Sequence, residues 1–452
     1  GKTVYACIDL INKSIAPKFI GYPLDHQHDF DSLLIALDGT ENKENIGGNT
    51  ILALSGAYFK LSAKLSDKPL WQYIAEKQGT SPGFPSIYAN IVGGGKHAPG
   101  LEIQEFMIVP QTKKPLEAIE QIVQIYKTLR TILTSLYGPS AKLVSDEGAM
   151  APVGARTEVI LEALSNLNAK SESKFDIALD AAANSFFDGQ LYNFESQKLH
   201  ASDLMKIYEQ LDTKFNVTSI EDPFSEKDLE GLELIKTTPR DKRGFKVISD
   251  DYTVTNAQKI ADFGKEKIFD GTIIKPDQVG SISEMFEAVK TAKTIGQEII
   301  ISHRSGESND TFIVDLAYGL GANGIKIGAP TRGERIAKYN RILEIAYSLE
   351  QNQAAAMPSM PPEKSLNQTA PVNVQPSEEK TPTPEITAPK NIAEPLASEN
   401  PAPVSSDYTM PNPSTPLSLN SFSAPVTPQN PIADRSMPAI QAVTTASNQA
   451  YD

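Results

Sequence analysis

From Phe175 onward, short apolar runs recur along the chain, and each one stops at a polar or charged residue. Such runs, bounded by turn residues, are typical of buried strands, and the stretches between them repeat apolar residues at helical spacing. The spacing from one run to the next is that of a βα unit. The pattern therefore predicts six consecutive βα units, whose strands end at Asp180, Glu221, Asp250, Lys275, His303 and Lys326.

Earlier parts of the chain complete this picture. Two further apolar runs, 86–92 and 101–109, read as strands, and a helix is expected at 116–137. Together they favour a closed (β/α)8 barrel, in which the carboxyl ends of the strands form the active-site face. An open doubly wound sheet is the alternative, but no Gly-x-Gly-x-x-Gly follows a strand. Helices are expected at 3–15, 31–37, 48–66, 201–215, 228–237, 255–265, 281–294, 310–320 and 333–349.

Composition divides the 452 residues into three parts. Residues 1–82 form a helical cap, 83–350 the barrel, and 351–452 a tail rich in Pro, Ala and Ser. The tail has no apolar periodicity and cannot bury enough surface to offset the entropy of ordering, so we expect it to be disordered.

Charge and cysteine content narrow the class of protein. The net charge of −14 argues against a nucleic-acid partner or an anionic membrane surface. Cys7 is the one cysteine, which excludes a disulfide framework and fits a reducing compartment. No apolar run reaches the ~18 residues of a membrane span. These features predict a soluble, cytoplasmic α/β protein.

Three acids end consecutive strands of the predicted barrel: Asp180, Glu221 and Asp250. Each alone is well explained as a helix cap or the partner of a loop ion pair. Three carboxylates brought to one rim would repel one another, and a divalent cation relieves that repulsion. Ligands that are all oxygen point to Mg²⁺ rather than Zn²⁺.

A lysine, Lys275, ends the next strand and faces the same mouth. It can act as a base only if its pKa falls, and nearby cations lower the pKa of an ammonium group. Lys326 and the metal would supply that field. The alternative is that Lys275 merely balances the charge of the acids.

Beyond these residues, His303-Arg304-Ser305 suits a phosphate, which arginine binds with two parallel hydrogen bonds, although an ordinary ion pair for Arg304 is the alternative. Glu105 and Glu147 are acids placed to handle a proton at a leaving hydroxyl. A metal, a base, a phosphate site and an opposed acid together predict proton abstraction beside a carboxylate, followed by loss of a β-hydroxyl.

The same residues lie in longer motifs that closely resemble the enolase family over about residues 1–350. The motifs are Leu37-Asp-Gly-Thr-Glu-Asn42, Gln104-Glu-Phe-Met107, Asp146-Glu-Gly148, Ser219-Ile-Glu-Asp-Pro-Phe224, Asp250-Asp-Tyr-Thr-Val-Thr-Asn256, Lys275-Pro-Asp-Gln-Val-Gly-Ser281, Ser302-His-Arg-Ser-Gly-Glu307 and Lys326-Ile-Gly-Ala-Pro330.

The resemblance implies a glycolytic enzyme that converts 2-phosphoglycerate to phosphoenolpyruvate and water. Asp180, Glu221 and Asp250 would hold Mg²⁺, and Lys275 would remove the C2 proton. Glu147, hydrogen-bonded with Glu105, would act as the acid on the C3 hydroxyl. The remaining residues would bind substrate: the phosphate through Arg304 and Ser305, the carboxylate end through Lys326, and the pocket walls through His97, Gln104 and His303.

It also implies a barrel that opens with a ββαα arrangement rather than βαβα. The resemblance begins about sixty residues into the family pattern, so the loop that closes over substrate in enolases would precede Gly1. A homodimer is possible but weakened by the loss of those strands. The rival hypothesis is a catalytically impaired, enolase-like scaffold whose tail binds partners.

Overall fold

The structure is a computed structural model that describes residues 4–98 and 100–356. The tail expected to be disordered lies, from residue 357 onward, outside the described residues. The expected end of the last helix, at residue 349, is wrong, because helix α14 (Gly333–Ala356) continues past it.

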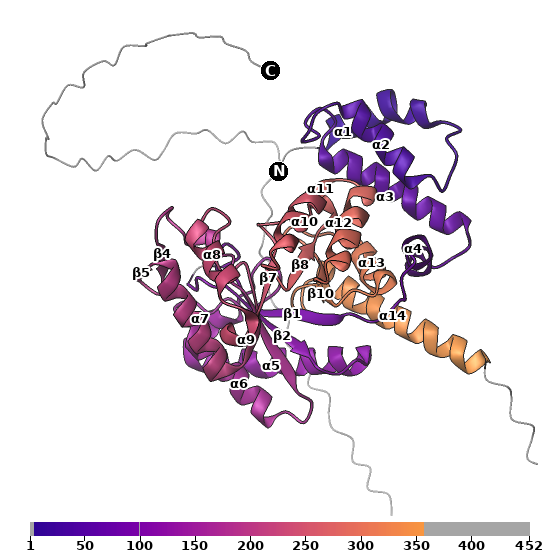
Figure 1. The fold of residues 1–452 in the computed structure, drawn as a ribbon. Helices are drawn as coiled ribbons and strands as arrows, with labels where there is room; N and C mark the ends of the chain where they lie inside the picture. Colours follow the sequence, from indigo (N-terminus) through magenta and orange to yellow (C-terminus); the bar gives the residue numbers. More distant parts are fainter. Residues whose placement is uncertain (1–3, 99, 357–452) are drawn as a thin grey trace, which may run out of the picture. The chain divides into compact units, whose positions relative to one another are not determined.

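Eight strands close into one barrel, as the sequence predicts (Figure 1). Around the barrel the order is β1-β10-β9-β8-β7-β6-β3-β2. The strands are β1 (Ser86–Gly93), β2 (Glu105–Pro110), β3 (Phe175–Asp180), β6 (Val217–Glu221), β7 (Lys246–Ser249), β8 (Gly271–Ile274), β9 (Glu298–Ser302) and β10 (Gly324–Lys326). Every predicted strand-end residue is the last residue of its strand or the next one along the chain.

Strand β2 runs antiparallel to both neighbours, whereas all other pairs in the barrel are parallel. Two helices, α5 (Pro115–Tyr137) and α6 (Thr157–Lys170), then lead to β3, which confirms the ββαα start. Because β2 is reversed, its first residue, Glu105, lies opposite Asp180, the last residue of β3. The acid at the start of one strand therefore reaches the same rim as the acids at the ends of the others.

The strand expected at 101–109 begins only at Glu105. The reason is a glycine loop that takes the hydrogen bonds of the preceding residues: Gly95 N–H donates to the Leu101 carbonyl and Gly94 N–H to the Gln104 carbonyl. A Cβ on Gly94 would lie 2.5 Å from the Ile103 carbonyl oxygen, so the two backbones approach closely because this residue is glycine.

Five expected barrel helices are present: α7 (Ala201–Phe215), α8 (Leu229–Thr237), α10 (Ala257–Lys265), α12 (Ile282–Thr294) and α13 (Phe312–Leu320). Helix α7 has the expected bounds, and the other four end as expected but begin one or two residues later. Short helices α9 (Arg240–Arg243) and α11 (Pro276–Val279), helix α6 and the hairpin β4 (Tyr192–Phe194)–β5 (Gln197–Leu199) were not expected. The core between helices and strands is one continuous apolar cluster, and smaller clusters around Met107 and Ile273 fill the barrel interior.

Helices and turns, here called the cap, make up the described residues before β1. They are α1 (Tyr5–Leu10), a π-helical turn (Ile11–Ile15), a 3₁₀ turn (Ala16–Phe19), α2 (Gln27–Asp38), α3 (Gly48–Leu65) and α4 (Leu70–Gln78). The helix expected at 3–15 is present from Tyr5 as an α-helix that continues into the π-helical turn, and α4 was not expected. Cap and barrel are joined by buried polar contacts at the start of α12, where Ile282 N–H donates to Ser55 and Ser283 N–H to Asp31.

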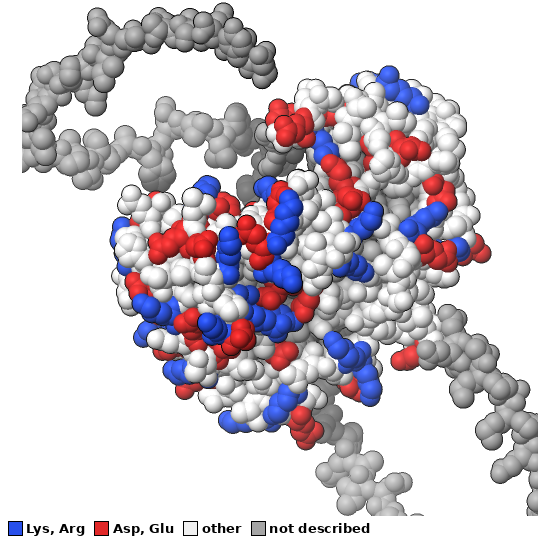
Figure 2. Space-filling view, viewed as in Figure 1, with Lys and Arg blue, Asp and Glu red and all other residues white. Residues whose placement is uncertain are grey.

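The visible surface carries no large area of one charge (Figure 2). Lysine and arginine are interspersed with aspartate and glutamate over the face shown. Within the described residues, no helix is long and apolar enough to cross a membrane.

Candidate active site

A cavity of about 270 Å³ opens where the parallel strands end. It is lined by all the site residues expected from the sequence except Glu221, which lies directly beneath, in contact with Lys326. A larger hollow of about 620 Å³ adjoins it between α3 and the loop after β9. That hollow is mainly apolar, so the chemistry belongs to the smaller, polar cavity.

Lys326, the last residue of β10, is the charge centre of the site. Its ammonium lies 2.8 Å from Glu221, 3.1 Å from Glu105 and 3.2 Å from Asp180, and the residue is 3% exposed. Burial opposes its charge, but the three carboxylates raise the pKa of Lys326 well above the usual value. Lys326 is therefore a fixed cation.

Lys275 follows β8 and forms a close ion pair with Asp250, which also accepts a hydrogen bond from Gln278 at 2.8 Å. The predicted fall in the pKa of Lys275 needs a metal ion as well as Lys326, and the protein groups alone do not produce it. Burial favours the neutral amine, yet the charges of Asp250 and Glu221 outweigh it and raise the pKa. The Lys326 charge acts in the expected direction but is too weak to prevail.

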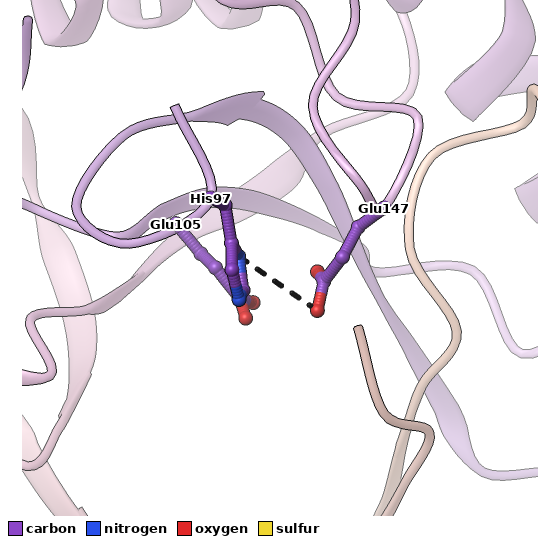
Figure 3. Close-up of side chains that lie close together, drawn as sticks. All are labelled: His97, Glu105 and Glu147. Atoms are coloured by element: carbon purple, nitrogen blue, oxygen red, sulfur yellow. Dashed lines mark ion pairs between the residues drawn. The ribbon is translucent and has the colours of Figure 1, made fainter. Parts of the chain in front are cut away.

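Glu147 and Glu105 face each other across the cavity with His97 beside them (Figure 3). Glu147 comes from the loop between α5 and α6, and its Oε1 lies 3.8 Å from Nδ1 of His97. The hydrogen bond expected between the two glutamates is not the one formed, because Glu147 accepts from Asn90 at 3.0 Å and Glu105 pairs with Lys326.

The two acids also differ in protonation. Burial and the charge of Glu147 raise the pKa of Glu105 well above the usual value. Burial alone would do the same to Glu147, but His303, His97 and Lys326 outweigh it and hold that pKa well below the usual value. Of the two acids, Glu105 is therefore the one that takes up a proton first as the pH falls.

His303 follows β9, and burial lowers the pKa of its imidazole despite the nearby Glu147. Near neutral pH the lowered pKa of each residue favours an ionised Glu147 beside a neutral His303.

The residues expected to bind phosphate are only partly placed for it. Arg304 lies at the cavity edge, where its guanidinium pairs with Asp277 at 3.1 Å, the ordinary ion pair that the sequence left open. Ser305 lines the cavity, and Gln104 donates to Asp180 at 3.4 Å.

The donor set suits a divalent cation, although its side chains are turned toward lysines. In the described residues, two groups of acids and histidines have ligand atoms that all lie within 4.8 Å of one another, His97-Glu105-Glu147 and Asp222-Asp250-Asp251. The expected triad of Asp180, Glu221 and Asp250 does not form such a group. Lys326 attracts Asp180 and Glu221, while Lys275 attracts Asp250. Yet Oε1 of Glu221 is buried without a hydrogen-bond partner, an acceptor for which a cation is the natural complement.

Two side chains that sequence reasoning did not assign organise the site. Asp222, after β6, accepts N–H bonds from Asp250 at 2.9 Å and Asp251 at 2.8 Å. Its backbone holds a left-handed φ of 42°, a strained state that is kept where surrounding contacts fix it. The second is Arg335, in the first turns of α14. Asp222 lies inside the motif Ser219–Phe224 and Arg335 lies after the last motif, and no spacing rule singles out either residue.

A closed barrel whose mouth gathers carboxylates, two lysines and two histidines is the architecture of an acid–base enzyme that works beside a divalent metal. Comparison with known proteins narrows this class. Residues 83–359 match the family model "Enolase, C-terminal TIM barrel domain", and residues 1–74 match "Enolase, N-terminal domain".

Individual relatives agree. The enolase of Thermococcus gammatolerans is 38% identical over 359 residues, which is 77% of this chain and 82% of the relative. The enolase of Mastigamoeba balamuthi is 36% identical over 371 residues, covering 78% and 84%. That of Methanocaldococcus jannaschii is 36% identical over 353 residues, covering 77% and 82%. The chain belongs to the enolase family, and its enzyme class is that of phosphopyruvate hydratase, a hydro-lyase.

Proposed function

We propose that the chain catalyses the reversible dehydration of 2-phosphoglycerate to phosphoenolpyruvate and water, with Mg²⁺ as cofactor. The observation that carries the proposal is the placement of Lys275 and the Glu105–Glu147 pair around one cavity of about 270 Å³. A base and an acid around one small cavity suit a reaction that removes a proton from one carbon and a hydroxyl from the next.

In this proposal Lys275 first loses its own proton to solvent, once the charge of a metal ion on Asp250 would offset the ion pair that holds it, and the neutral amine then takes the C2 proton. The C3–oxygen bond breaks as the C2–C3 double bond forms. The leaving hydroxyl receives a proton from the glutamate pair and departs as water. Since Glu105 is the acid that takes up a proton first, that proton reaches the hydroxyl from Glu105, through Glu147 or directly. The atoms balance: one proton remains on Lys275, and one has left the acid.

Mg²⁺ held by Asp180, Glu221 and Asp250 would supply their counter-charge, free Lys275 from Asp250, and stabilise the negative charge that develops on the substrate carboxylate. Lys326 adds a fixed positive charge that suits the same carboxylate end. Arg304 is the ligand we propose for the phosphate, which would displace Asp277 from it. Ser305, His97, Gln104 and His303 form the walls.

The test is the appearance of the ultraviolet absorbance of phosphoenolpyruvate when the full chain is mixed with 2-phosphoglycerate and Mg²⁺. Removing a general base costs about 10²–10⁴-fold, so Lys275→Ala should lower the rate at least about 100-fold. Lys290→Ala, at an exposed lysine of α12, is the matched control and should keep the wild-type rate. A wild-type chain without signal, or an active Lys275→Ala variant, contradicts the proposal.

The same proposal includes a cytoplasmic location, in keeping with the unpaired thiol of Cys7, and a homodimer, which light scattering after size exclusion tests. The scaffold hypothesis is not favoured, because the chain matches both enolase family models.

A further inference from the structure

Arg335, in the first turns of α14, is a buried guanidinium behind the active site. It is 0% exposed, and its nearest carboxylate, that of Glu334, lies 3.7 Å from Nε. Its hydrogen bonds go instead to backbone carbonyls, those of Ser305 at 2.7 Å, Arg304 at 2.8 Å and Asp146 at 3.1 Å. One side chain therefore ties the loop after β9 to the loop that carries Glu147.

The fourth contact of Arg335 is with Nδ1 of His303. A guanidinium has only donors, so the imidazole nitrogen that faces it must be the acceptor. A proton on Nδ1 would set two donors against each other in a buried site. We propose that Arg335 is a positioning residue that fixes His303 as the tautomer protonated at Nε2 and so presents an N–H donor to the cavity.

The other side of the ring fits this assignment. Nε2 of His303 is buried, lacks a hydrogen-bond partner among the described residues, and lies 3.4 Å from Oε2 of Glu147. An unsatisfied buried donor at the wall of a cavity is suited to an acceptor oxygen of a ligand. The charged groups that face His303 are Glu147, Arg335 on α14 and Lys326 on β10; the two cations oppose a positive ring and Glu147 favours it.

The ring is closely packed. Gly328 has φ of 75°, and a Cβ there would lie 2.7 Å from the Glu147 carbonyl oxygen, 3.0 Å from Cε1 of His303 and 3.1 Å from Cδ of Arg335. The backbone N–H of His303 also donates to the Lys326 carbonyl at 3.1 Å. The tautomer is thus set by a guanidinium that can only donate, next to a closely packed ring.

The test is a long-range ¹H–¹⁵N spectrum of the imidazoles in the full chain with ¹⁵N-labelled histidine, which requires no turnover and so stands apart from the proposed reaction. The His303 signals are assigned by their loss in His303→Gln. We expect an unprotonated Nδ1 and a protonated Nε2 throughout about pH 5.5–8.5, a range in which an unrestrained histidine would titrate. Protonation of Nδ1 near neutral pH, alone or together with Nε2, overturns the proposal.

Variants separate positioning from simple loss of packing. In Arg335→Met, His303 should begin to titrate, with a rise in its pKa of roughly one unit, a tenfold change in the protonation equilibrium. Arg335→Lys keeps a cation that only donates and should restore the Nε2–H form. Lys338→Met removes another buried cation of α14, which contacts Ser308 and Glu307 but not His303, and should leave the His303 signals unchanged.

If Arg335→Met leaves the titration of His303 unchanged, Arg335 does not position His303. The same conclusion follows if Lys338→Met changes that titration as much as Arg335→Met does. If Arg335→Met does not fold, Arg335→Lys and the wild-type spectrum still decide, because either one showing a proton on Nδ1 contradicts the assignment.

Discussion

Replacing Lys326 with methionine should lower the free energy of unfolding by about 3–5 kcal/mol at neutral pH, the usual cost of removing one partner from a buried ion pair. Methionine is also unbranched and only one atom shorter than lysine, so the change removes the charge with a small change in volume. It leaves the carboxylates of Glu221, Glu105 and Asp180, now 2.8–3.2 Å from the ammonium, without that counter-charge. Since these acids can take up protons instead, their protonation limits the cost.

The cost should depend on pH in a definite direction. Burial raises the pKa of Glu105 and of Glu221 well above the usual value of 4.5 even with Lys326 in place. A carboxyl group whose pKa is raised by folding contributes its stability fully below the unfolded pKa, and this contribution is lost as the pH rises through the folded pKa. Without Lys326 the pKa values of both glutamates rise further. The loss of unfolding free energy in Lys326→Met should therefore be small near pH 4.5 and largest at neutral pH and above.

Urea denaturation of the full chain in EDTA, with wild type and variant compared at each pH, measures this deficit from the shift in midpoint at constant slope. Lys114→Met is the matched control, because Lys114 also pairs with a glutamate, at 2.7 Å, but on the exposed surface. It should leave the midpoint unchanged at every pH. A deficit for Lys326→Met below about 1 kcal/mol at neutral pH, or one that does not shrink toward acid, would refute the reasoning from buried charge.

Three further outcomes follow from the site. Asp222→Asn should lower the free energy of unfolding by about 2 kcal/mol, because an amide cannot accept both N–H groups of Asp250 and Asp251; an unchanged urea midpoint would contradict this. Gly328→Ala should cost about 1–3 kcal/mol through its φ of 75° and a backbone oxygen 2.7 Å from the new Cβ, and a thermal midpoint equal to that of wild type would be the contrary result. Mg²⁺ at about 100 times its dissociation constant should stabilise the wild-type chain by about 2.7 kcal/mol and Asp180→Asn by less; an equal gain in both would remove Asp180 from the metal ligands.

Much of the barrel could be predicted because its signals are local. An apolar run that stops at a charged residue marks a buried strand and its end, and the strands that stop at Asp180, Glu221 and Lys326 end as expected. Helix α6 and the β4–β5 hairpin were not predicted, because the apolar spacing in these segments was not identified as regular structure. Their contacts with neighbouring elements show that they are regular. Strand β2 was placed too early, because the carbonyls of Leu101 and Gln104 accept hydrogen bonds from a glycine loop whose path the sequence does not show.

The candidate site was predictable as a set of residues but not as a set of contacts. The ion pair between Lys275 and an acid, which the sequence left as the alternative, is present, and the direction of the Lys275 pKa shift depends on which of several charges lies closest. Arg335 and Asp222 gave no signal of their own, because each acts on backbone groups that are distant in the sequence.

The sequence by itself determined the class of fold, the residues at the ends of the strands and the family, since each is written in apolar spacing or in the order of short motifs. Only the tertiary structure decided which carboxylate pairs with which lysine, which glutamate takes up a proton first and which nitrogen of His303 carries one. The physical reason is that electrostatic and hydrogen-bond energies depend on distances of a few ångströms between residues far apart along the chain, and folding alone sets those distances.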